Sequence, residues 1–313
     1  MKQESFSLRS DFDGKQLVMT EISAGEPRFL FQITHGMAEH RARYYPFMEY
    51  IASLGGACIA GDMRGHGETA GAADYGFFGD DAVEAVLADV AQTGDVLRRR
   101  YEGLPFVLLG HSMGSLVARA YAAAHDETLS ALILTGEASY NPGVGAGLAF
   151  ARMISAVRGG RYHSRFVDYL ATGLFNRGFT PDEGSDGQFL WLSADLENRR
   201  AFEADPACGF SFTVNGYIAL FSFMKYAYAP KNWNVRNKAM PVLFLSGEDD
   251  PVMVSRRRFD DAVRFVRDMG YRTVSSRLYP GMRHEILNET DKQSVYADIR
   301  AFLAGVPGIT LSE

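Results

Sequence analysis

Gly110-His111-Ser112-Met113-Gly114 is the stretch that decides the fold, because of what lies on either side of it. The preceding residues 106–109 read Phe-Val-Leu-Leu, a short apolar run typical of a buried strand. The following residues 115–124 are rich in Ala and contain no Gly or Pro, which predicts a helix. A Gly-x-Ser-x-Gly between a strand and a helix is the pattern of a tight turn that holds the serine side chain above the end of the strand.

The position of Ser112 favours a role as a nucleophile over the alternative, a helix-capping serine in a Gly-rich turn. The helix that follows directs its first N–H groups and the positive end of its dipole at whatever the serine attacks. A serine hydroxyl needs a base to accept its proton and an acid to orient that base. We therefore expect a histidine and a carboxylate beside Ser112.

Strands and helices alternate on both sides of this turn, which predicts an α/β fold with a mostly parallel sheet and helices on both faces. Two alternating segments open the chain and predict a hairpin. The expected strands are residues 5–8, 16–20, 28–33, 57–60, 106–109, 131–134, 240–245 and 271–278, and the expected helices are residues 45–54, 80–100, 115–124, 256–269 and 291–303.

The alternation stops between residues 137 and 230, a stretch rich in Gly, Phe, Tyr and Met with no convincing strand. Its helical patches are residues 147–157, 164–175 and 187–201. We predict a core made of residues 1–136 and 231–313, and a helical cap, or lid, of residues 137–230 inserted over the carboxyl edge of the sheet.

The base and the acid are expected in two loops that follow late strands. His284 lies in a loop containing Pro and Gly directly after the last expected strand, which places it at the carboxyl edge. Asp250 is the favoured acid because Gly247 makes the turn and Pro251 fixes the backbone behind it. Asp249 is its nearest rival, as an aspartate that forms the turn or caps a helix.

Two backbone N–H groups are expected to bind the developing oxyanion of the substrate. One belongs to Met113, directly after the serine. The other is expected from Met37, in the loop of residues 34–40 after the third strand, where Gly36 allows the backbone to approach the substrate.

Histidines in and near this loop raise the question of a metal site. His35 and His40 are potential ligands, but no third ligand is close in the sequence, so we expect them to brace the loop. Arg64 and His66 follow the next strand and are expected to form hydrogen bonds with neighbouring loops.

Composition places the chain among globular proteins, with 47% apolar and 22% charged residues. A net charge of −6 and the absence of a Lys and Arg stripe argue against a nucleic-acid partner. The first residues lack the apolar core of a signal peptide, and no stretch approaches the length of a membrane span. Cys58 and Cys208 are the only cysteines, which favours a reduced cytoplasm. We expect no disulfide framework, no cofactor and no metal ion.

Five stretches of the chain carry a family resemblance: residues 35–44, 62–67, 110–115, 247–252 and 280–288. Through them the chain resembles the monoacylglycerol lipase and lysophospholipase group of α/β-hydrolases. The resemblance covers the sheet domain, from residue 29 to 135 and from 240 to 303. It implies an α/β-hydrolase fold and a serine hydrolase that cleaves carboxylic esters through an acyl-enzyme.

The resemblance also places Glu39 and Arg43 near the polar head of the substrate. Without it, these residues are a charged pair beside the oxyanion loop, equally consistent with a structural ion pair. Both interpretations stay open at this point.

The insertion is expected to supply an apolar acyl pocket, and some of its apolar residues instead form its own core. Exposed aromatic residues of the lid suit either a peripheral membrane contact or a second subunit. The candidates for lining the acyl pocket or forming the core of the insertion are Phe150, Met153, Phe166, Tyr169, Phe175, Phe189, Trp191, Phe210, Phe212, Tyr217, Phe221 and Phe223.

The leading hypothesis is an esterase or lipase for monoacylglycerol-like or lysophospholipid-like esters. In it Ser112 attacks, His284 is the base and then the acid, and Asp250 orients His284. One alternative keeps the fold and changes the reaction, to a small-ester or thioester hydrolase, a C–C hydrolase or a cofactor-free haloperoxidase. Another is a non-catalytic ligand receptor, which the complete predicted triad argues against.

Overall fold

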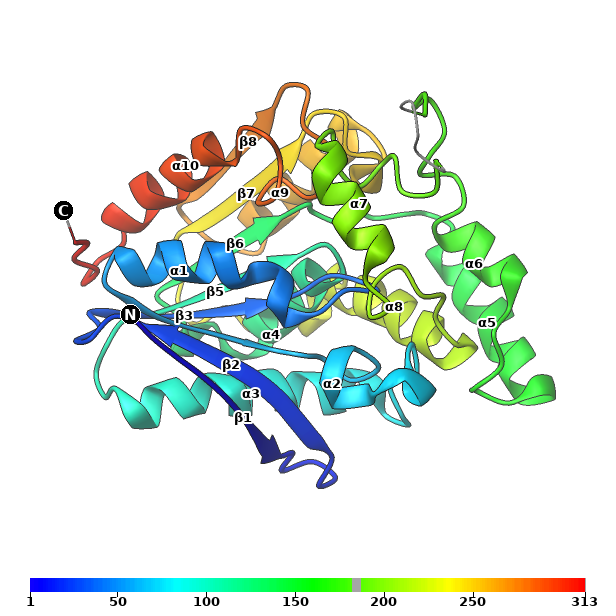
Figure 1. Cartoon of the computed structure of the whole chain (residues 1–313), viewed down its shortest axis with the longest axis horizontal. Helices are drawn as coiled ribbons and strands as arrows, with labels where there is room; N and C mark the ends of the chain where they lie inside the picture. The colour runs from blue at the N-terminus through cyan, green and yellow to red at the C-terminus, as the bar shows by residue number, and fades with distance from the viewer. Residues whose placement is uncertain (182–186, 313) are drawn as a thin grey trace.

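A mixed sheet organises the chain (Figure 1). The computed structural model describes residues 1–181 and 187–312. In that part of the chain the sheet has eight strands, in the order β1-β2-β4-β3-β5-β6-β7-β8. β1 and β2 form an antiparallel hairpin, β2 is also antiparallel to β4, and all later neighbours are parallel. The strands are β1 (Lys2–Arg9), β2 (Gln16–Ser23), β3 (Phe29–Thr34), β4 (Gly56–Gly61), β5 (Phe106–His111), β6 (Ala131–Thr135), β7 (Val242–Gly247) and β8 (Val274–Tyr279).

Helices cover both faces of the sheet, which is why β3, β5, β6 and β7 are buried along their whole length and read as continuous apolar runs. On one face α1 and α10 pack through residues such as Ile51 and Ile299. On the other face α3, α4 and α9 pack through residues such as Leu116 and Val266. The helices outside the insertion are α1 (Tyr45–Ser53), α2 (Gly67–Ala70), α3 (Ala82–Arg100), α4 (Met113–His125), α9 (Arg256–Asp268) and α10 (Lys292–Ala304). The predicted α/β fold is confirmed.

Among the described residues, four α-helices lie between β6 and β7, in the stretch predicted to be a cap. They are α5 (Val144–Arg158), α6 (Arg165–Ala171), α7 (Leu196–Ala204) and α8 (Val214–Ala227). Figure 1 shows α5 and α6 at the edge of the molecule, beyond the ends toward which the parallel strands point.

Two expectations for this stretch need correction. The helix expected over residues 187–201 begins only at Leu196, because the Asp195 side chain caps it by accepting hydrogen bonds from the Glu197 and Asn198 N–H groups. The helix α8 has no counterpart among the expected elements. It begins where the Thr213 side chain accepts a hydrogen bond from the N–H of residue 216.

A buried ion pair ties the helix after Ser112 to the start of the insertion. Arg119 of α4 lies 2.9 Å from Glu137, and neither side chain is exposed to solvent. Arg119 also donates to the Ala138 carbonyl at 3.0 Å, and the Tyr228 hydroxyl donates to Glu137 at 2.7 Å. The guanidinium lies over the Tyr228 ring, 4.5 Å from its centroid. These contacts fix both chain ends of the insertion against α4.

Candidate active site

Ser112 occupies a sharp turn between β5 and α4. Its φ of 53° and ψ of −120° form a conformation that residues other than glycine rarely adopt. The Ser112 N–H donates to the Thr135 carbonyl at 3.0 Å, which holds the turn against β6. A Cβ at Gly114 would clash with the Thr34 carbonyl, and one at Gly110 would clash with Gly114 itself. The two glycines of the motif therefore stand where the backbone packs too closely for a side chain.

His284 and Asp250 form a hydrogen-bonded pair that is closed off from solvent. Nδ1 of His284 donates to Oδ2 of Asp250 at 2.9 Å, which leaves Nε2 free to act as a base. The Ser246 hydroxyl donates to the same oxygen at 2.9 Å, and the Val252 N–H donates to the other oxygen at 2.8 Å. Asp249, the rival acid, is exposed.

Two opposing effects set the protonation of His284. Burial lowers the pKa of its imidazole, but the charge and hydrogen bond of Asp250 outweigh burial and raise that pKa above the ordinary value. The ring also contacts His111 and Trp191, with centroids 4.7 and 5.0 Å away. Burial, and then the charge of His284, hold the pKa of His111 well below its usual range. His111 thus packs against the base as a neutral ring, a role that its position next to Ser112 did not reveal.

Ser112 and His284 both line one cavity, of about 970 Å³. The apolar residues that the sequence assigned jointly to the pocket or the cap core separate into three groups. The cavity is lined by Phe150, Phe175, Phe189, Trp191, Phe210 and Phe221. The buried group is Phe212, Tyr217 and Phe223, and the exposed group is Met153, Phe166 and Tyr169. Half of the candidates therefore face the cavity.

The loop after β3 lies directly against the serine. A Cβ at Gly36 would stand 3.1 Å from the Ser112 Cβ, so the backbone of the loop reaches the nucleophile closely. Met37 and Met113 both line the cavity. Within the described part of the chain, neither N–H group has a hydrogen-bond partner. Both donors are thus available at the place where an oxyanion is expected.

Two buried histidines hold this loop in shape. Nε2 of His35 accepts a hydrogen bond from the Met63 N–H at 2.9 Å, while Nδ1 is hydrogen-bonded to the Gly36 carbonyl at 2.8 Å. Nε2 of His66 accepts from the Ala38 N–H at 3.1 Å, and Nδ1 bonds to the Arg64 carbonyl at 2.9 Å. Burial lowers the pKa of His35 to about 4 and lowers that of His66 as well, so both rings are neutral. His35 thus braces the loop as expected, and His66 forms the expected hydrogen bond with a neighbouring loop.

Glu39 and Arg43 belong to a buried cluster with Glu285, the residue after His284. Arg43 lies 3.4 Å from Glu39 and forms a second, closer ion pair with Glu285. Oε1 of Glu39 accepts from the Gly36 N–H at 2.5 Å and from the Tyr44 hydroxyl at 2.8 Å. Burial and the charge of Glu285 raise the pKa of Glu39 to about 7. Glu39 is thus occupied by protein partners, which favours the structural interpretation of the pair. Glu285 directly follows His284 in the sequence, but its ion pair with Arg43 was not predicted.

Comparison with known proteins places this arrangement in a family. Residues 25–291 match the family model described as serine aminopeptidase, S33. A monoacylglycerol lipase of Mycolicibacterium smegmatis is 26% identical over 281 residues, covering 89% of each chain. Phospholipase YtpA of Bacillus subtilis is 25% identical over 287 residues, covering 89% of this chain and 96% of the relative.

Solved structures agree with the fold. A thermostable carboxyl esterase from Bacillus coagulans has a TM-score of 0.87 at 25% identity, covering 98% of this chain and 99% of its own. The yeast monoglyceride lipase has a TM-score of 0.72 at 20% identity, which shows a common fold. The predicted class, a carboxylic ester hydrolase with the α/β-hydrolase fold, is confirmed. The chain belongs to the serine aminopeptidase S33 family, in the monoacylglycerol lipase and lysophospholipase group of α/β-hydrolases.

Proposed function

We propose that the protein cleaves esters of monoacylglycerol or lysophospholipid type through an acyl-enzyme on Ser112. His284 accepts the serine proton through Nε2 and later returns it to the leaving alcohol, while Asp250 holds the ring and stabilises its charged form. The N–H groups of Met37 and Met113 bind the oxyanion of each tetrahedral intermediate. Water then attacks the acyl-enzyme by the same route and releases the acid.

The observation that carries this proposal is one cavity shared by the nucleophile, the base and the aromatic side chains of the insertion. An acyl chain buries apolar surface against those side chains at about 0.8 kcal/mol per CH₂. The ester carbonyl then lies at Ser112, beside the loop of Met37. Glu39 and Arg43 act here as positioning residues, because Glu39 holds the Gly36 N–H of that loop. The alternative of a small-ester or thioester hydrolase uses the same triad, and the size of the cavity favours the longer acyl chain.

The test is covalent labelling with a fluorophosphonate, followed by kcat/KM on p-nitrophenyl esters from acetate to palmitate. We expect labelling at Ser112 and an optimum at a medium or long chain. Ser112→Ala removes the attacking oxygen, so turnover should fall on the order of 10⁴-fold or more, while its circular dichroism spectrum stays unchanged. An optimum at acetate would overturn the lipase-like proposal. Absence of labelling in folded protein would favour the receptor alternative.

The outer surface of α5 and α6 favours contact with a lipid surface over contact with a second subunit. Residues 144–177 contain five arginines and only one acidic residue, Asp168, in a chain of net charge −6. Cations beside exposed apolar side chains suit an anionic lipid headgroup region. In the part of the chain that is described, no helix has the length and apolarity to cross a bilayer. The exposed apolar residues there are Met153, Val157, Tyr162, Phe166, Tyr169, Leu170 and Leu174.

Sedimentation with vesicles tests this contact. We expect binding to vesicles that contain phosphatidylglycerol, and weaker binding to pure phosphatidylcholine or after Val157→Asp. Phe12→Asp, a change at an exposed apolar residue of the β1–β2 turn, is the matched control and should bind as the native chain does. Equal binding of both variants would overturn the assignment of this surface. The cytoplasmic location remains a prediction from cysteine usage.

A further inference from the structure

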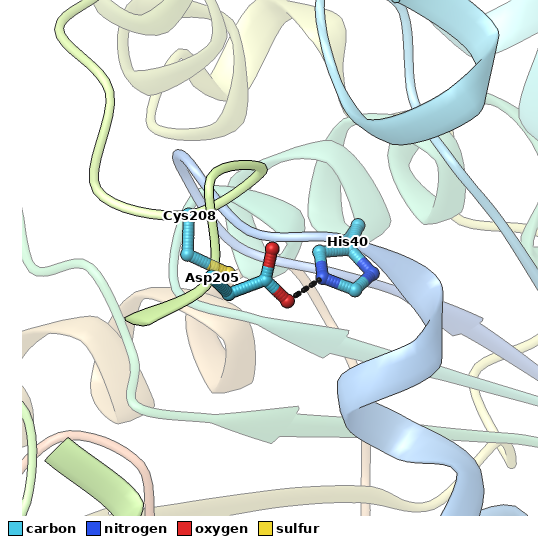
Figure 2. Close-up of side chains that lie close together, drawn as sticks. All are labelled: His40, Asp205 and Cys208. Carbon is cyan, nitrogen blue, oxygen red and sulfur yellow. Dashed lines mark hydrogen bonds and ion pairs between the residues drawn. The ribbon is translucent and has the colours of Figure 1, made fainter. Parts of the chain in front are cut away.

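His40, Asp205 and Cys208 meet at the junction of the oxyanion loop and the loop after α7 (Figure 2). A ring nitrogen of His40, a carboxylate oxygen of Asp205 and Sγ of Cys208 all lie within 4.8 Å of one another. Nε2 of His40 is hydrogen-bonded to Oδ2 of Asp205 at 2.9 Å. His40 lies 165 positions before Asp205 in the chain, so spacing alone does not suggest that these residues form a group.

Imidazole nitrogen, carboxylate oxygen and thiolate sulfur are the donors that Zn²⁺ takes in proteins. Tetrahedral zinc with ordinary bond lengths holds its ligand atoms roughly 3.3 to 3.8 Å apart. A side-chain movement of about 1 Å therefore brings this cluster to that spacing. We propose that His40, Asp205 and Cys208 form a binding site for a divalent metal ion of the zinc type, with water in the fourth position.

The backbone around the cluster already holds the ligands in place. Oδ1 of Asp205 accepts from the Ala207 N–H at 2.8 Å, which leaves Oδ2 directed at His40. The Cys208 N–H donates to the Asp205 carbonyl at 2.9 Å and so folds the two residues into one turn. The side chains of His40 and Asp205 are 15% and 34% exposed, so an ion reaches them from solvent.

His35, the other histidine of the oxyanion loop, takes no part, because protein groups occupy both of its ring nitrogens. In the cluster, metal binding breaks the hydrogen bond between His40 and Asp205. The proton on Nε2 of a neutral His40 moves to Nδ1, and the Cys208 thiol releases its proton to solvent.

A metal here joins two walls of the catalytic cavity. His40 ends the loop that carries Met37, and Cys208 precedes Gly209 and Phe210, which line the cavity. The Gly209 N–H already donates to the Ala38 carbonyl at 2.9 Å. A bound ion therefore adds a second, stronger link between the oxyanion loop and the insertion, at a site that does not touch the nucleophile.

Cobalt titration tests the site without using turnover, because a thiolate bound to Co²⁺ gives a charge-transfer band and tetrahedral Co²⁺ gives strong visible bands. The tag-free full chain should show both, with one ion per chain, and Zn²⁺ should displace the cobalt. Cys208→Ser should abolish the charge-transfer band. His40→Gln and Asp205→Asn should each weaken binding on the order of 100-fold or more, because each removes a ligand.

Two control variants test whether cobalt binds at residues outside the proposed site. Cys58→Ala removes the only other cysteine, and Ser112→Ala removes the proposed nucleophile; both should bind cobalt as the native chain does. The Ser112→Ala result also makes failure of this proposal distinguishable from failure of the proposed function. A charge-transfer band that persists in Cys208→Ser, or the absence of any saturable band in the native chain, overturns the metal site.

Discussion

Gly147 offers a direct way to shorten the acyl pocket. It lies on α5 and lines the cavity, and a Cβ built on it would stand 3.4 Å from the Phe221 ring, in ordinary van der Waals contact. Gly147→Leu therefore places four carbon atoms in the space beside Phe221 without a backbone clash. We expect the added side chain to exclude about three methylenes of a long acyl chain, at about 0.8 kcal/mol each. The loss is about 2.4 kcal/mol, or roughly 50-fold in kcat/KM for long esters.

The assay is kcat/KM on the p-nitrophenyl ester series, compared between the native chain and the variant. Values for short esters should stay unchanged, because their acyl chains end before Phe221. Gly145→Leu is the matched control: Gly145 is exposed on the same helix, and a Cβ there meets no atom within 4 Å. Both changes replace glycine in α5, so any general effect on the helix is shared. An equal loss on short and long esters, or the same profile in both variants, would refute the assignment of this part of the cavity.

Two further predictions concern the catalytic pair and the buried ion pair. The acidic limb of kcat/KM against pH should have its midpoint above the ordinary histidine pKa, because Asp250 raises the pKa of His284. Asp250→Asn removes the largest effect that opposes burial and leaves only the smaller effects of Glu285 and Glu39, so that midpoint should move to lower pH, with kcat reduced on the order of 10⁴-fold; an unmoved midpoint in pH–rate profiles contradicts this assignment. Glu137→Ala should lower the free energy of unfolding by about 3–5 kcal/mol, because it leaves the Arg119 charge buried without its partner. The control Glu127→Ala breaks a solvent-exposed pair and should cost less than about 1 kcal/mol; equal midpoints in urea titrations of the two variants would count against the argument.

The sheet domain could be predicted from the sequence because its signals are local. Each buried strand is a short apolar run, and the turn at Ser112 is marked by glycines that pack too closely for a side chain. The choice of Asp250 over Asp249 also rested on local turn chemistry, and it is Asp250 that contacts His284 in the structure. The α/β-hydrolase fold and the candidate triad thus follow from segments of a few residues each.

The helices of the insertion are harder to predict from the sequence, because they are defined by caps and by contacts with distant residues. The side chains of Asp195 and Thr213 begin two helices whose extents the apolar pattern did not reveal. The pairing of Arg43 with Glu285 and of His40 with Asp205 joins segments far apart in the chain. No pattern in a single sequence reports such contacts, since they depend on how the loops meet at the edge of the sheet.

The division of the cavity wall between two parts of the chain has a consequence for how this protein can change over evolution. The turn of Ser112 and the pair of His284 and Asp250 are held by hydrogen bonds within the sheet domain. Trp191 of the insertion also packs against His284. The aromatic lining comes from the insertion, partly from its helices and partly from the segments between them. Substitutions in that lining at positions other than Trp191 can therefore alter the range of accepted substrates while the bond-breaking groups keep their geometry. A laboratory library confined to the insertion should yield new specificities with few inactive members.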